Sequence, residues 1–180
     1  MKRLSDARTL RQSGSPPIVG GMSESTRWLL DRVEILDVVT RYFNSADRRD
    51  FDALIDCFVP GALVDYSELL PVSAAAPIVE VAAVIEAAMA ELYGPTQHFI
   101  GNHECTIDSD TARVETYCLA MHAYLDPARE GGARPASALR YLDDFVRSAN
   151  GGWRIRHRRV TRDFALSLPD RAVAIWSPGR

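Results

Sequence analysis

The chain has few cysteines, and their arrangement does not suggest a covalent or metal-based scaffold. Cys57, Cys105 and Cys118 are odd in number, and their spacing fits neither a zinc site nor a disulfide framework. We therefore interpret all three as reduced, small core residues.

An excess of positive charge and an uninterrupted apolar run are also missing. The formal net charge of −3 gives no reason to expect nucleic acid or an anionic membrane as partner. Pro77, Glu80 and Glu86 interrupt the alanine-rich stretch 74–92, so this stretch does not predict a membrane span. Residues 1–21 lack the apolar centre of a signal peptide, and we expect a cytoplasmic protein.

The length and the distribution of proline and glycine predict one domain between two tails. A chain of 180 residues can bury a core of its own as a single domain. Residues 1–24 are polar and contain Pro16-Pro17 and Gly20-Gly21, which is typical of a flexible tail. We expect the folded domain over 25–166 and a C-terminal tail over 167–180.

Apolar residues recur at helical spacing in the first half of the chain and at strand spacing in the second. Helices are expected from about 25 to 47–49, over 51–58 and over 78–92, with a short strand at 62–66. Long strands are expected at 97–107, 112–125, 136–147 and 153–164. This order predicts an α+β fold in which three N-terminal helices pack on a curved, mostly antiparallel sheet and enclose a pocket.

His98 is the strongest candidate for chemistry in the predicted sheet. In a regular strand His98 and His103 point to opposite faces, which argues against a metal held by both. A three-residue loop at 109–111 would place His122 directly across from His98 on the same face. A loop of another length could separate the two rings.

Two residues outside the long strands could assist His98. Asp47, at the end of the first helix, could bond one imidazole nitrogen and leave the other as a base. Tyr66, at the end of the short strand, could polarise a carbonyl or protonate a leaving group. The alternatives are that Asp47 is a solvated helix end and that Tyr66 is a core residue with its hydroxyl at the surface.

The blocks that contain these residues are similar to a known family. The chain resembles the SnoaL-like branch of the NTF2-like superfamily, and within it scytalone dehydratase, in Tyr42…Asp47-x-x-Asp50-Phe51, Val64-Asp65-Tyr66, Thr96-Gln97-His98-Phe99-Ile100-Gly101-Asn102, Tyr117…His122 and Gly152-Trp153-Arg154-Ile155. The resemblance implies a cone-shaped fold whose pocket lies between the helices and the concave sheet. It also implies that Asp47 pairs with His98, and that Tyr66 and His122 complete the catalytic set.

The sequence departs from scytalone dehydratase at three positions of the pocket. Ala46 stands where the dehydratase has a tyrosine, and in an ungapped comparison Leu139 and Tyr141 stand where it has a serine and an asparagine. The base, the acid that orients it and one phenol are retained. The groups that contact the other oxygens of the substrate are changed, which argues against scytalone itself as the substrate.

Other residues are expected to form the substrate-binding wall by their position: Tyr42, Leu69, Asn102, Leu139 and Tyr141. Arg140 is expected outside, because it neighbours Tyr141 on one strand. In the basic run 154–159, alternation places Arg154, Arg156 and Arg158 on one face, typical of a solvated or interface face rather than of a nucleic-acid site.

The combined pattern predicts a cofactor-independent, metal-free lyase that acts on a small oxygenated aromatic or polyketide-like molecule. The leaving group could be water, halide or a one-carbon fragment. The alternatives are an isomerase or cyclase that uses the same pocket, and a non-catalytic module for small-molecule binding or dimerisation. An apolar outer face with Phe99, Ile107, Tyr117, Leu119 and Met121 predicts a homodimer or homotrimer.

Overall fold

In the computed structural model the described residues are 23–126, 128–129 and 134–168. In chain order, the elements are α1 (Glu24–Arg48), α2 (Phe51–Ile55), β1 (Phe58–Asp65), β2 (Ala76–Pro77), α3 (Ile78–Leu92), β3 (Tyr93–Asp108), β4 (Thr111–Tyr124), β5 (Arg134–Arg147) and β6 (Trp153–Leu168). The predicted tails, 1–24 and 167–180, fall almost entirely outside the described residues.

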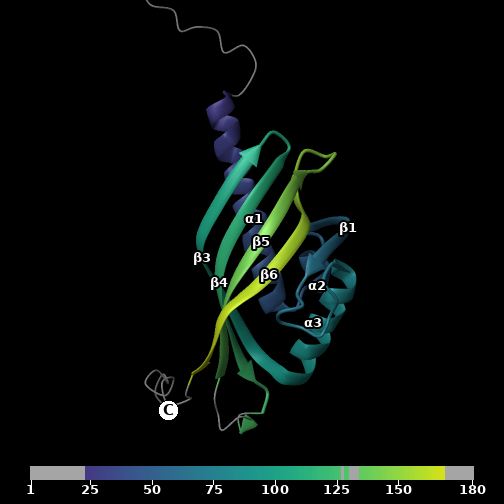
Figure 1. The fold of residues 1–180 in the computed structure, drawn as a ribbon, viewed down its shortest axis with the longest axis vertical. Helices are drawn as coiled ribbons and strands as arrows, with labels where there is room; N and C mark the ends of the chain where they lie inside the picture. The colour runs from purple at the N-terminus through teal and green to yellow at the C-terminus, as the bar shows by residue number, and fades with distance from the viewer. Residues whose placement is uncertain (1–22, 127, 130–133, 169–180) are drawn as a thin grey trace, which may run out of the picture.

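The strands form one twisted, curved sheet in the order β2-β1-β6-β5-β4-β3 (Figure 1). All neighbours are antiparallel except β1 and β6, which run parallel. Figure 1 shows α1 crossing one face of the sheet, with α2 and α3 at its lower side. The α+β architecture with three helices on a mostly antiparallel sheet is therefore confirmed.

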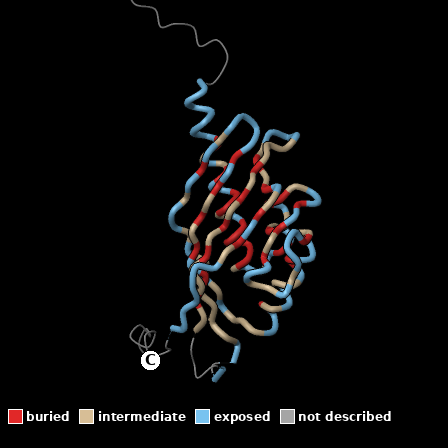
Figure 2. Tube along the Cα trace, viewed as in Figure 1, coloured by how far each residue is buried: buried red, intermediate tan, exposed pale blue. Residues whose placement is uncertain are grey.

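Helix α1 contributes a stripe of buried residues to the core. The side chain of Ser23 caps its first turn by accepting a hydrogen bond from the backbone N–H of Thr26. Its buried apolar residues recur three or four positions apart, which aligns them on the face that meets the sheet: Ile35, Val38, Val39, Tyr42, Phe43 and Ala46. Figure 2 shows that the buried part of the chain concentrates where the sheet and α1 face each other.

The second helix is shorter than the sequence predicts, and β1 is longer. Helix α2 ends at Ile55, and β1 already begins at Phe58. The backbone of this segment finds partners in β6, where the N–H of Ile155 donates to the carbonyl oxygen of Cys57 at 3.0 Å. Pairing with a distant strand thus ends the helix earlier than its local pattern indicates.

A polar network fixes the upper end of α1 to the sheet. Arg147 Nη2 lies 2.8 Å from Asp31 Oδ2, and the indole Nε1 of Trp153 donates to Asp31 Oδ1 at 3.1 Å. Trp153 is fully buried, and the Arg147 guanidinium lies 4.5 Å from the centre of its ring. The candidate site lies at the opposite, C-terminal end of α1, where Asp47 contacts β3.

Cys57, Cys105 and Cys118 are free and buried, as the sequence indicates. No helix within the described ranges is long and apolar enough to cross a membrane.

Candidate active site

Asp47 and His98 meet at the lower end of α1. His98 Nδ1 lies 2.7 Å from Asp47 Oδ1, and the His98 backbone N–H donates to Asp47 Oδ2 at 3.1 Å. The His98 side chain is 8% exposed, and its ring stacks on Phe43 with the centroids 5.6 Å apart. Burial alone would raise the pKa of the Asp47 carboxyl, but hydrogen bonds from His98 and Thr96 outweigh burial and lower it. An ionised carboxylate therefore fixes the imidazole from behind.

Arg49 and Thr96 hold this pair from the other side. The Thr96 hydroxyl donates to Asp47 Oδ1 at 2.8 Å, and Arg49 donates to Thr96 Oγ1 at 3.0 Å and to the Gly94 carbonyl at 2.6 Å. Arg49 has a left-handed backbone with φ 62°, which a residue with a Cβ adopts only when its surroundings enforce it. The end of α1 and the start of β3 are thus joined around Asp47.

His122 lies beside His98 but not directly across from it. The loop between β3 and β4 is shorter than the three residues that would place the two rings directly opposite, and His98 pairs with Ala120 while His122 pairs with Thr96. The two imidazoles still touch edge to face, with centroids 5.6 Å apart. Burial, followed by repulsion from His98, lowers the pKa of His122 to about 4, so this ring is neutral at neutral pH.

Tyr42, Tyr66 and Tyr141 form a buried cluster deeper in the fold. The hydroxyl oxygens of Tyr42 and Tyr66 are 2.5 Å apart. Burial raises the pKa of each phenol, so all three are protonated at neutral pH. Because one hydroxyl must donate to the other, the accepting phenol keeps a proton for a ligand.

A buried ion pair supports the tyrosines. Arg158 Nε and Nη2 lie 2.6 and 2.7 Å from the two carboxylate oxygens of Asp143, and both side chains are 0% exposed. The guanidinium carbon lies 4.0 Å from the centre of the Tyr42 ring and 4.8 Å from that of Tyr141. Arg158 Nη1 is buried and has no hydrogen-bond partner among the described residues.

These groups surround a cavity of about 200 Å³. Its described lining is Tyr42, Ala46, Tyr66, Leu69, Leu70, Ile85, Ala88, Met89, Tyr93, His98, Ala120, His122, Pro135, Ser137, Leu139, Tyr141 and Arg162. The structure thus brings the predicted wall residues Tyr42, Leu69, Leu139 and Tyr141 together with Tyr66, His98 and His122. Asp47 stands behind His98, outside the lining.

The position predicted for Asn102 is wrong. Asn102 is exposed, and the β3–β4 register shifts between Ile100 and His103, where β3 contains a bulge. The extra residue turns the His103 side chain inward, and His103 Nδ1 lies 3.0 Å from the hydroxyl oxygen of buried Thr116. His98 and His103 therefore share a face, contrary to the expectation of opposite faces. Ile107 follows the same shift and packs against the core instead of joining the outer face.

A second register shift corrects the interpretation of the basic run. The β5–β6 register shifts between Asp144 and Phe145, so Trp153, Ile155 and Arg158 all point inward. Arg158 is a core residue and not part of a solvated face. Arg140 lies outside as expected, where it pairs with Asp163 and Glu115.

The described part of the chain contains no group of three or more His, Cys, Asp or Glu side chains that could hold a metal ion. The pocket instead offers a histidine oriented by a carboxylate, a neutral histidine and phenolic donors. This set can accept a proton from a substrate and hold an oxygen at which negative charge develops.

The structure is similar to known proteins that share this fold. A Kribbella flavida protein aligns with a TM-score of 0.69 at 26% identity, over 77% of this chain and 95% of the other. A Novosphingobium aromaticivorans protein provisionally named a scytalone dehydratase aligns with a TM-score of 0.68 at 19% identity, over 81% and 96%. The hexachlorocyclohexane dehydrochlorinase LinA-type3 of Novosphingobium barchaimii aligns with a TM-score of 0.66 at 14% identity, over 81% and 94%.

These alignments and the helix–sheet architecture define an NTF2-like α+β protein with a pocket. The chain belongs to the SnoaL-like domain family, whose sequence pattern matches residues 27–159. An uncharacterised protein of Mycobacterium tuberculosis is 32% identical over 140 residues, which are 74% of this chain and 86% of that protein.

Several residues of the site are not apparent from the sequence alone. Arg49 lies in a pair of arginines at a helix end, which is also the pattern of a solvated terminus. Ser137 and Arg162 line the pocket, but only the pairing of β5 with its neighbours shows which side they face. Ser137 lies two residues before Leu139 and gives the wall of the pocket a hydroxyl.

Proposed function

We propose that the protein is a cofactor-independent lyase for a small oxygenated aromatic or polyketide-like molecule. The observation that carries the proposal is the 2.7 Å contact between His98 Nδ1 and Asp47 on the wall of an otherwise mostly apolar pocket. A pocket that only binds a ligand has no need of an oriented base. The pocket also places phenolic donors in the same lining as His98.

In the proposed reaction, His98 Nε2 removes a proton from a carbon next to a carbonyl or at a benzylic position. Asp47 holds the imidazole and stabilises the imidazolium that forms. Tyr66, whose hydroxyl is paired with Tyr42, donates to the oxygen on which charge develops. The electron pair of the C–H bond then forms a double bond, while water or halide departs with the electron pair of its bond to carbon.

His122 is suited to a narrower role than that of a cationic acid. With a pKa of about 4 it is neutral at neutral pH, so it can offer the departing group a hydrogen bond from its N–H but not the proton of an imidazolium. The proton that the leaving group requires then comes from the His98 imidazolium or from solvent.

Similar proteins support elimination as the reaction class. One structural neighbour is named a dehydrochlorinase and another is provisionally named a scytalone dehydratase. Loss of hydrogen chloride and loss of water both begin at a C–H bond, and both suit one oriented base. At these identities the neighbours indicate the fold, and the chemistry rests on the residues of the pocket.

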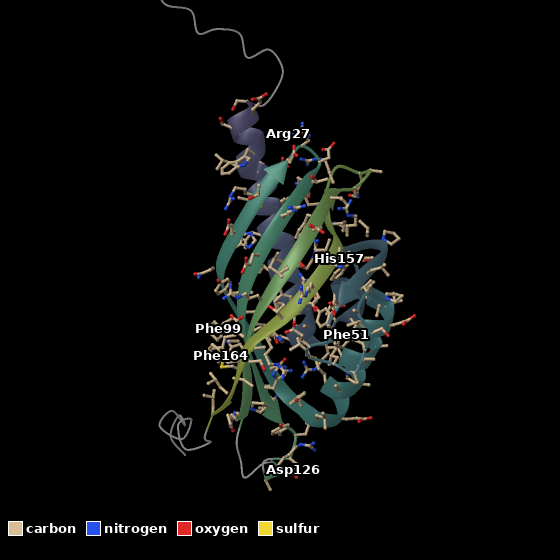
Figure 3. All side chains as sticks on the ribbon, in the orientation of Figure 1. Arg27, Phe51, Phe99, Asp126, His157 and Phe164 are labelled. Atoms are coloured by element: carbon tan, nitrogen blue, oxygen red, sulfur yellow. The ribbon has the colours of Figure 1, made fainter. Side chains whose placement is uncertain are left out.

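The test compares wild-type protein with Asp47→Asn and His98→Gln on a panel of hydroxylated aromatic and polyketide-like compounds. Each variant should lose about a hundred- to ten-thousand-fold in kcat/KM, the usual contribution of a general base. His157→Gln is the matched control, because His157 lies on the outer face (Figure 3). Folded Asp47→Asn and His98→Gln proteins with full activity would refute the proposal.

Mass spectrometry of the product separates the remaining alternatives. A product lighter than the substrate by one leaving group supports a lyase, and an unchanged mass identifies an isomerase or cyclase. Binding that survives His98→Gln without turnover of any compound identifies a non-catalytic module.

A further inference from the structure

Arg162 is the only permanently charged side chain among the described residues that line the pocket, and no described lining residue is acidic. It is exposed to solvent, so it stands at the mouth of the cavity and not in its depth. The charge is unexpected here, because the chain as a whole has a net charge of −3. The entrance therefore offers one positive charge that can pair with an anionic group of a ligand.

The acidic residues close to Arg162 are already engaged by other arginines. Asp163, the next residue along β6, accepts from Arg140 Nε at 2.9 Å. Glu68 accepts the backbone N–H of Arg162 at 3.0 Å and the Arg159 side chain at 3.4 Å. The Arg162 guanidinium makes no hydrogen bond or ion pair with a described residue. Its donors are thus available to a ligand.

Ser137 adds a hydroxyl between Arg162 and the base. The cross-strand register places His98 opposite Ala120, and Ala120 opposite Ser137, while Arg162 pairs with the next inward residue of β5, Leu139. Strands lie about 4.8 Å apart, so two strand spacings separate the backbones of His98 and Ser137 by roughly 10 Å. That distance is on the scale of one aromatic ring and its substituents.

We infer that Arg162 and Ser137 form a carboxylate-binding subsite at the mouth of the pocket, and that the substrate is an organic acid. The inference builds on the proposed function, because it orients the same substrate. The carboxylate binds the planar guanidinium, a geometry that allows two parallel hydrogen bonds, and the Ser137 hydroxyl donates a third. The carbon that loses its proton then lies near His98, about one ring away from the charged group.

The experiment measures binding of matched acid and amide pairs by isothermal titration calorimetry. The compounds are trans-cinnamate with trans-cinnamamide and 2-naphthoate with 2-naphthamide, which differ in charge but hardly in shape. Wild-type protein should bind each acid about fivefold or more tightly than its amide, as expected for a charged hydrogen bond partly exposed to water.

Arg162→Met should abolish this preference while the affinity for the amides stays within about twofold, because methionine retains much of the apolar stem. Arg162→Lys should retain part of the preference for acids, since the positive charge remains but the paired, coplanar N–H donors of the guanidinium are lost. Arg156→Met is the control, an exposed arginine of the same strand that lies outside the pocket. Circular dichroism checks the fold of each variant.

Equal affinity of wild-type protein for acids and amides would overturn the inference. A preference that persists in Arg162→Met, or absence of binding of either acid at millimolar concentration, would do the same. The outcome is independent of turnover. A preference for carboxylates without any reaction would support the subsite and contradict the proposed lyase activity. Turnover of neutral compounds without this preference would support the lyase activity and contradict the subsite.

Discussion

Removing one partner of the Asp143–Arg158 pair should be among the most destabilising single changes in the domain. Both side chains are 0% exposed and make two hydrogen bonds of 2.6 and 2.7 Å. In Arg158→Met the carboxylate stays buried without its counter-charge, which costs about 3–5 kcal/mol of unfolding free energy. Domains are stable by only about 5–15 kcal/mol, so the loss is a large fraction of the total.

The double variant Asp143→Leu/Arg158→Met separates the cost of a stranded charge from the value of the pair. Two apolar side chains of similar volume need no partner, so the double variant should lie within about 1–2 kcal/mol of wild type. The coupling energy of the cycle should then be at least about 3 kcal/mol, far above the few tenths seen for independent sites.

Urea unfolding at fixed protein concentration measures these free energies, with the fluorescence of buried Trp153 as the signal. Single variants that each cost less than about 1 kcal/mol, or a double variant whose cost equals their sum, would refute this reasoning.

Two further predictions concern the pH dependence of stability and the outer face. The pKa of His122 is about 4 in the folded chain against 6.5 in the reference state. Above pH 6.5 His122 therefore costs the folded state no unfolding free energy, and this free energy is lost progressively as the pH falls towards 4. His122→Gln should reduce that loss by up to roughly 3 kcal/mol, measured by urea unfolding at several pH values, and an unchanged profile contradicts the assignment. Phe99, Leu119 and Phe164 lie in one cross-strand row on the outer face and are 54%, 37% and 55% exposed. Figure 3 labels the two phenylalanines of this row. We propose that this row is covered in a homodimer or homotrimer. Light scattering at micromolar concentration should then show a multimer, and Leu119→Lys should convert it to a monomer. A monomeric wild-type protein would exclude this assembly.

Much of the fold follows from local patterns in the chain. The helical repeat of α1 and the alternation in β4 and β5 are long and regular, and these elements occur close to their predicted positions. The places of His98 and Tyr66 at a strand start and a strand end make them candidates for the site, but position alone leaves Tyr66 open to the alternative of a core residue. The place of Asp47 at a helix end makes it a possible partner of His98, and the family resemblance favours this pairing over a solvated helix end, because no local pattern joins residues about fifty positions apart.

Where the prediction of strand faces fails, the cause is a change of register within a strand. Alternation assigns faces correctly until one extra residue enters a strand, and from that point every assignment is reversed. The extra residues in β3 and β6 reverse the assignments of Asn102 and Arg158. The Asn102 side chain is exposed, and the Arg158 side chain is buried. Gly101 signals the first bulge weakly, and no residue type in 153–158 marks the second.

The bulge at 101–102 also affects how the length of this chain can change during evolution. Five positions separate the two inward residues His98 and His103, and a regular strand needs an even number. Deleting Gly101 or Asn102 would therefore leave a regular strand with both histidines still inward and no side chain inverted. Related sequences can gain or lose one residue at this point without exchanging the pocket wall for the surface. What such a change alters is the local bend of β3, and with it the angle at which His98 approaches Asp47.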